Sequence, residues 1–301
     1  MKMIHIIKKK RTQLLSLAIV TMMLLSVVAC DSNGMSAEDH TPPTESEAPE
    51  ATSSTRDDAD RVHLNFIECG ITDQQLAEMI AGGEIAEGVK GLVLSGNSIS
   101  DLIPLSELTE LELLTLSNNP ISDLTPLKEL KNLTSLVIKD GSISDLAPLS
   151  GLTKLTVLNL SNNPISDITP LGGLTNLTTL HLHNCRISDL TPLEGLMSLS
   201  WLHLSHNQIS DLSPLSGLTA LTALSLSDNQ ISDITRLTGL FVLDDLDISS
   251  NMISDAMPLG DIPSLTFINL LENPSITQEQ IDDLLNILPN TCFKGIREGY
   301  T

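Results

Sequence analysis

The chain has 301 residues, with 16 Lys and Arg against 38 Asp and Glu, which gives a formal net charge of −22. This acidity argues against nucleic acid and anionic lipid headgroups as partners of the body of the protein, because both are negatively charged. Only 2% of the residues are aromatic, so any cluster of aromatic side chains requires an explanation.

The first 29 residues have the pattern of a secretory signal peptide, because a basic segment precedes an apolar run that is short for a membrane span. The run ends in Val27-Val28-Ala29-Cys30, which resembles the lipobox of bacterial lipoproteins. The resemblance implies that Cys30 is diacylated and that the protein is a membrane-anchored lipoprotein of the bacterial cell envelope, exposed outside the cytoplasm. An ordinary cleaved signal and an uncleaved anchor are the alternatives.

Residues 30–60 form an acidic segment after the signal peptide. They are rich in Ser, Thr, Pro, Asp and Glu and contain almost nothing that could build a core. This composition predicts a disordered linker. A chain of about 30 such residues would hold a folded domain tens of ångströms from a membrane.

A 22-residue unit then recurs, as in LELLTLSNNPISDLTPLKELKN (111–132) and LTVLNLSNNPISDITPLGGLTN (155–176). Its asparagine falls at Asn97, Asn119, Asn163, Asn207, Asn229, Asn251 and Asn273, and the two gaps in the series are filled by Gly141 and Cys185. Self-similarity at a fixed period predicts a solenoid of tandem repeats over residues 91–273.

Each unit contains the signals of a short strand and a tight turn. Leu114 and Leu116 alternate with period two, which predicts a strand with its leucines inward, paired in parallel with its neighbours. The asparagine amide is expected to satisfy backbone groups that would otherwise be buried unpaired, so the repeat with Gly141 should be locally weaker or hydrated. The aspartate of the ISD(L/I)xPL segment, such as Asp123, is expected to cap a single turn of 3₁₀ helix.

Atypical units flank the array, as the open ends of a solenoid require. Residues 61–90 are predicted to be an N-terminal capping repeat, in which Thr72 and Gln75 form a capping-box signature before a helical pattern. Residues 274–301 are predicted to be a C-terminal helical cap, with the same signature at Thr277 and the glutamine three residues later.

The unit LxxLxLxxNxIxDLxPLxxLxx is similar to the 22-residue leucine-rich repeats of the bacterial internalin group, over roughly residues 62–292. The resemblance implies an α/β solenoid, a right-handed curved array with a parallel β-sheet on the concave face, short 3₁₀ or loop segments on the convex face, and helical capping units at both ends. It also implies that the concave face binds a protein partner, often a host or neighbouring-cell protein. Residues 288–292 (LPNTC) have cysteine where a sortase signal needs glycine, so anchoring is expected from Cys30.

Most outward-facing residues of the predicted strands are small: Ser95, Thr115, Ser117, Asn159, Ser161, Ser225, Ser227 and Ser249. Two central repeats depart from this pattern with His181, His183, Trp201, His203 and His206, all expected to face outward. Together with Asp228 and Asp247 they are predicted to bind the partner, because Trp and flat rings offer large contact area for little entropy loss. Drift on a solvent-facing strand is the alternative. An acidic patch would favour a basic region of the partner: Asp228, Asp245, Asp247 and Glu272.

Two metal sites are conceivable from the spacing. His181 and His183 lie on one face of a strand and His203 lies one strand away, which allows three imidazoles around Zn²⁺, although side chains on a curved sheet splay apart. A file of aspartates could collect Ca²⁺, but each member precedes the turn that it is expected to cap: Asp101, Asp123, Asp145, Asp167, Asp189, Asp211, Asp233 and Asp255. No cofactor is expected.

Enzyme motifs are missing from the sequence, which has no Gly-rich phosphate loop, G-x-S-x-G, CxxC pair or HExxH, so an enzyme is not expected. The favoured function is that of a lipid-anchored cell-surface protein that mediates protein–protein interaction in adhesion or host or cell-surface recognition. The alternatives are a metal- or small-ligand-capturing lipoprotein that uses the central histidines, and a structural spacer of the envelope. Because imidazoles charge below about pH 6.5, binding is expected to depend on pH.

Overall fold

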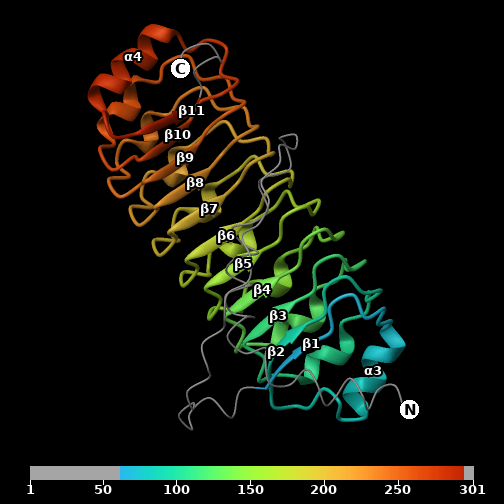
Figure 1. The fold of residues 1–301 in the computed structure, drawn as a ribbon. Helices are drawn as coiled ribbons and strands as arrows, with labels where there is room; N and C mark the ends of the chain where they lie inside the picture. The colour runs from blue at the N-terminus through green and yellow to red at the C-terminus, as the bar shows by residue number, and fades with distance from the viewer. Residues whose placement is uncertain (1–61, 295–301) are drawn as a thin grey trace, which may run out of the picture. The chain divides into compact units, whose positions relative to one another are not determined.

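The computed structural model describes residues 62–294, in which short strands alternate with short helices (Figure 1). The strands are β1 (Val62–Asn65), β2 (Val89–Val93), β3 (Leu113–Thr115), β4 (Ser135–Val137), β5 (Val157–Asn159), β6 (Thr179–His181), β7 (Trp201–His203), β8 (Ala223–Ser225), β9 (Asp245–Asp247), β10 (Phe267–Asn269) and β11 (Cys292–Lys294). They form one sheet in sequence order, and from β2 onward each neighbouring pair is parallel.

Most segments between the strands contain one turn of 3₁₀ helix, as expected for a 22-residue repeat. These helices are η1 (Ile103–Glu107), η2 (Thr125–Glu129), η3 (Ala147–Leu149), η4 (Thr169–Leu171), η5 (Thr191–Leu193), η6 (Ser213–Leu215), η7 (Thr235–Leu237) and η8 (Met257–Asp261). They lie on the convex side of a curved solenoid whose concave side is the sheet (Figure 1). The predicted fold class is therefore confirmed.

The signal peptide, Cys30 and the linker of residues 30–60 lie outside the described residues. The chain from Leu64 onward belongs to one compact unit. Within residues 62–294, no helix has both the length and the apolar character needed to cross a membrane.

The core is a continuous column of leucine and isoleucine, aligned from repeat to repeat. Leu180 pairs in register with Leu202, and Leu202 with Leu224, each 22 residues further along the chain. In the repeat of β7, Leu202 of the strand, Leu204 just after it and the convex Leu215 are fully buried. Each such side chain contributes about 1.5–3 kcal/mol relative to exposure, before conformational entropy is subtracted.

The asparagine series forms a hydrogen-bonded ladder inside the solenoid, as predicted. The Oδ1 of Asn229 accepts the N–H of Ile209 in the preceding repeat (3.0 Å), and its Nδ2 donates to the carbonyls of Leu204 (3.1 Å) and Leu226 (3.0 Å). The same arrangement recurs at Asn97, Asn119, Asn163, Asn207, Asn251 and Asn273. Each asparagine therefore ties two successive repeats together through their backbones.

The ladder changes where Gly141 and Cys185 replace asparagine. In the preceding repeat, the N–H of Ile121 turns to the carbonyl of Asn119 and the N–H of Ile165 to that of Asn163, both at 2.8 Å. A Cβ atom on Gly141 would lie 2.8 Å from the Oδ1 of Asn163. The N–H of Ile121 is therefore bonded within its own repeat, and the backbone of Gly141 lies close to Asn163. The lower stability or hydration of this repeat stays a prediction.

The aspartate file caps the convex turns. The Oδ1 of Asp123 accepts the N–H of Thr125, the first residue of η2, at 2.8 Å. The equivalent bonds are 2.8–3.0 Å long at Asp101, Asp145, Asp167, Asp189, Asp211, Asp233 and Asp255. The predicted capping role is confirmed, although the aspartate stands one residue before the helical N-cap position, which Leu124 occupies.

One α-helix packs beside the first 3₁₀ turn of the array and another beside the last. Helix α3 (Asp73–Ala81) begins after Thr72, which forms the predicted capping box with Gln75. Helix α4 (Gln278–Ile287) begins after Thr277, whose hydroxyl accepts the N–H of Gln280 at 3.3 Å.

The C-terminal cap differs from its prediction in two ways. The amide of Gln280 reaches back to the last repeat, where it bonds the carbonyl of Ser254 (3.0 Å) and the N–H of Ala256 (3.4 Å). Strand β11 then adds to the edge of the sheet beside β10, so the described part of this segment, which ends at Lys294, contains a strand as well as a helix.

Candidate functional site

Five rings form a continuous strip across the concave face of β6 and β7. The ring centroids are 5.9 Å apart for Trp201 and His181, 5.7 Å for His181 and His203, 5.1 Å for His203 and His183, and 4.9 Å for His183 and His206. We call these five residues the ring strip. The register of the two strands, which aligns His181 with His203, brings the rings together.

His181 differs from its prediction, because it is buried. It occupies an outward position of β6, but only 3% of its surface is exposed, since Trp201 and His203 lie against it. Its Nε2 atom has no hydrogen-bond partner. A buried polar atom without a partner costs about 1–3 kcal/mol, which the packing of Trp201 and His203 against His181 has to offset.

Burial also sets the protonation state of His181. Desolvation, followed by the positive charges of His203, Lys139 and His183, lowers the pKa of His181 from its ordinary value near 6.5 to about 4. The expectation that imidazoles of this cluster gain charge below pH 6.5 is therefore wrong for His181, which stays neutral well below that pH.

The ring strip ends in a carboxylate. The Nδ1 of His206 lies 2.5 Å from an Oδ2 oxygen of Asp228, the equivalent residue of the next repeat. Both residues have positive φ angles, 56° and 52°, in a file of left-handed residues beside the asparagine ladder. His and Asp are both among the non-glycine residues that adopt this conformation most often. The contact was not predicted, although the 22-residue separation of His206 and Asp228 places them at equivalent positions of neighbouring repeats.

Asp247 lies apart from the rings, on β9, and is held by neutral groups. Its Oδ1 accepts the N–H (3.0 Å) and the hydroxyl (2.6 Å) of Ser249, and its Oδ2 accepts the Nδ2 of Asn269 (3.1 Å). On the same strand, desolvation by the surrounding protein and the carboxylates of Asp247 and Asp244 raise the pKa of Asp245, although its side chain is exposed. Of the predicted partner-binding residues, the structure joins all but Asp247 into one contiguous group.

Several small residues that were expected to face solvent are buried instead. Ser117, Asn159 and Ser161 are each about 95% covered. Beside the ring strip, the hydroxyls of Ser205 and Ser225 lie 2.6 Å apart, and the Ser227 hydroxyl donates to that of Ser205 at 2.9 Å.

The two conceivable metal sites do not form in the described part of the chain. Among residues 62–294, no group of three or more His, Cys, Asp or Glu side chains is placed to hold a metal ion. His181, His183 and His203 contact one another through their rings, and the convex aspartates bond the turns that they cap. Hydrogen bonds from Thr191 lower the pKa of one such aspartate, Asp189.

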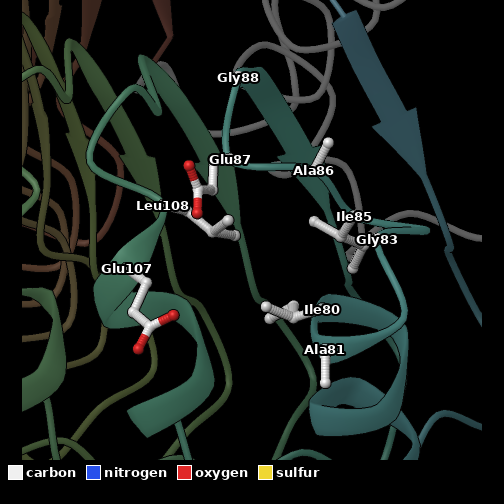
Figure 2. A pocket seen from close by; sticks show the side chains of 9 residues that line it. All are labelled: Ile80, Ala81, Gly83, Ile85, Ala86, Glu87, Gly88, Glu107 and Leu108. Carbon is white, nitrogen blue, oxygen red and sulfur yellow. The ribbon is translucent and has the colours of Figure 1, made fainter.

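An open cavity of about 540 Å³ lies at the N-terminal cap, far along the sheet from the ring strip (Figure 2). Residues of α3, the following loop and the end of η1 line it: Ile80, Ala81, Gly83, Ile85, Ala86, Glu87, Gly88, Glu107 and Leu108. It contains none of the site residues that the sequence predicted.

Known proteins share this architecture. A family model for leucine-rich repeats in two copies matches residues 88–129, 131–173, 153–195 and 198–239. A solved internalin, inlF, of Listeria monocytogenes is 29% identical, with a TM-score of 0.53, over 74% of this chain and 82% of that chain. Internalin C2 of the same organism is 31% identical, with a TM-score of 0.50, over 69% and 80%.

A leucine-rich-repeat protein of Leptospira interrogans shares the fold, with 22% identity and a TM-score of 0.60 over 73% of this chain and 62% of that chain. No curated protein sequence matches the chain.

The tandem repeats, the parallel sheet and the asparagine ladder define a leucine-rich-repeat solenoid, a fold that suggests protein–protein interaction and typically serves as a non-enzymatic binding scaffold. The repeat length and the likeness to internalin C2 are more specific. The chain belongs to the internalin-like leucine-rich-repeat proteins.

Proposed function

We propose that this protein binds a protein partner through its concave face, as a lipid-anchored protein of the bacterial cell surface acting in adhesion or recognition. The observation that carries the proposal is the ring strip, five contiguous rings on a face otherwise made mostly of small or polar residues. Clustered aromatic side chains at the centre of a surface are typical of binding hot spots.

The members of the site have different roles in this proposal. Trp201 is half-buried and supplies the main apolar contact area, and His181 supports its ring from the neighbouring strand. His183 and His203 continue the contact surface. The exposed His206 and Asp228, with Asp247 on β9, form its polar rim.

Lipid attachment at Cys30 would place this surface outside the cytoplasm. The support is the lipobox-like sequence before Cys30 and the acidic linker after it. Labelling of cells with a radioactive fatty acid tests this part of the proposal, because wild type should carry the label and Cys30→Ser should not. Equal labelling of both proteins would reject the anchor.

Capture of a metal ion is less well supported than protein binding. The three histidines that it would use contact one another by their rings, and no metal-holding group occurs between residues 62 and 294. The ring strip, with its half-buried tryptophan, fits a protein surface better than a closed ligand site.

A pull-down with the full-length protein from envelope and host-cell extracts tests the proposed site. Trp201→Ala should lose a partner that wild type retains, because the largest contact side chain is gone. Phe241→Ala is the matched control, since Phe241 is an aromatic residue with 66% exposure that lies outside the strands. A partner retained equally by all three proteins would place the binding site elsewhere.

A further inference from the structure

Strand β8 separates an aromatic strand from an acidic one on the concave face. Ala223 of β8 aligns with Trp201 on β7 and with Asp245 on β9. Neighbouring strands are about 4.8 Å apart, so the indole and the carboxylate stand on strands separated by roughly 10 Å, with only a methyl group between them. Two residues further along each strand, the small Ser225 likewise lies between His203 on β7 and Asp247 on β9.

The acidic side of this arrangement favours a cation. Asp245 is exposed, and the carboxylates of Asp247 and Asp244 act on it with the same charge, opposed by the single cation Lys294. Like charges on adjacent positions repel, so a positive group placed beside Asp245 lowers the electrostatic free energy of the strand. Asp247 is already oriented by neutral donors and stays beside it.

The aromatic side offers a complementary surface. The face of an indole ring attracts a cation within about 6 Å of its centroid, more strongly than phenyl or phenol rings do. Trp201 rests on His181, whose buried Nε2 has no hydrogen-bond partner.

We propose that the concave face receives an arginine side chain of its protein partner over Ala223. A guanidinium in that place lies about 5 Å from the strands that carry Trp201 and Asp245, close enough to stack on the indole and to reach the carboxylate. Arginine fits better than lysine, because its flat guanidinium both stacks and bonds a carboxylate through two parallel N–H groups. The inference rests on the proposed function, of which it names the recognised side chain.

Trp201 is the only tryptophan of the chain, so its fluorescence reports on this site alone. The full-length protein is titrated with the peptide acetyl-Gly-Arg-Gly-amide and with its citrulline analogue, which has nearly the same shape without the charge. The arginine peptide should change the fluorescence saturably, with an affinity at least about tenfold higher than that of the citrulline peptide. Raising the salt from about 0.05 to about 0.5 M should weaken it. Equal affinities, or no saturable change with either peptide, overturn the proposal.

Two single-charge variants locate the interaction. Asp245→Asn should weaken the arginine peptide about tenfold or more, because it removes the paired carboxylate. Asp244→Asn is the matched control, since it removes the same charge one residue before β9 begins. The carboxylate of Asp244 accepts a hydrogen bond from the hydroxyl of Thr266. Equal losses in the two variants would indicate only a diffuse field and would refute the placement over Ala223.

A third variant distinguishes this inference from the proposed function. Ala223→Leu fills the place assigned to the guanidinium with an apolar side chain at a half-buried position of β8 and should abolish saturable binding of the arginine peptide. If the pull-down partner is lost with Trp201→Ala but retained by Asp245→Asn and Ala223→Leu, the protein-binding site stands and the arginine inference fails. If Trp201→Ala also retains the partner, the proposed site itself fails.

Discussion

Replacing Cys185 by asparagine should stabilise the solenoid, because it completes the ladder at one of its two gaps. The Sγ of Cys185 lies 3.8 Å from the carbonyl oxygen of Leu160 and 3.7 Å from that of His183. Asparagines in other repeats direct Nδ2 to the equivalent carbonyls, as Asn207 does at 2.9 Å and 3.2 Å. The thiol therefore occupies the place of an amide nitrogen, and the backbone around it is already suited to one.

The expected gain follows from counting hydrogen bonds. An asparagine at this position would offer its Oδ1 to the N–H of Ile165, which now turns to Asn163, and its Nδ2 to Leu160. The bond to Ile165 replaces an existing one, so the count rises by one bond, the one from Nδ2, which is worth about 1 kcal/mol. For a domain of this size, that corresponds to a rise in Tm of roughly 3 °C.

Thermal and urea unfolding followed by circular dichroism measures the change in Cys185→Asn. The matched control is the reverse exchange, Asn207→Cys, in which Asn207 gives up its bonds to Ile187 and Leu182 and the protein should lose about 1–3 kcal/mol. The stabilising role assigned to the asparagine ladder is wrong if Cys185→Asn lowers the midpoint, or if Asn207→Cys leaves it unchanged.

Three further changes test other parts of the structure. Gly141→Ala should cost about 1–3 kcal/mol in urea unfolding, because its Cβ would lie 2.8 Å from the Oδ1 of Asn163; an unchanged midpoint would contradict this close approach. His181→Asn should remove a pH dependence of the stability. As the pH drops from about 6.5 to about 4, unfolded wild type takes up a proton on His181 and the folded form does not. Wild-type stability should therefore fall by about 3 kcal/mol over this range. Parallel stability curves for the two proteins over this range would refute the burial of the imidazole. Asp211→Ala should lose about 1 kcal/mol by thermal unfolding and Asp211→Asn much less, since only alanine deletes the acceptor of the Ser213 N–H; equal losses would show that the charge, rather than the cap, matters.

The repeating part of the fold was predictable because each of its causes is local and recurs. The leucines at Leu202 and Leu204 alternate, the asparagine keeps its spacing, and each convex aspartate stands two residues before the N–H that it accepts. Strand β11 could not be predicted in this way, because Cys292–Lys294 carries no repeat pattern and its pairing depends on how α4 returns the chain to the sheet.

The residues of the candidate site could be predicted from the sequence, but their burial and their contacts could not. The positions of Trp201 and the histidines follow from the period, but the burial of His181 depends on side chains of two other strands, which a count along one strand does not include. The contact between His206 and Asp228 combines a ladder position with an uncommon left-handed backbone.

The two gaps in the ladder divide the array into mechanically different parts. Wherever an asparagine accepts from the preceding repeat, pulling the two repeats apart must break a buried bond between them, whereas the N–H groups of Ile121 and Ile165 bond within their own repeat. In a linear array held only by contacts between neighbouring repeats, the interfaces with the fewest hydrogen bonds between repeats are expected to separate first. Under tension applied between a tethered N-terminus and a partner held near β7, both joints lie on the path that transmits the load.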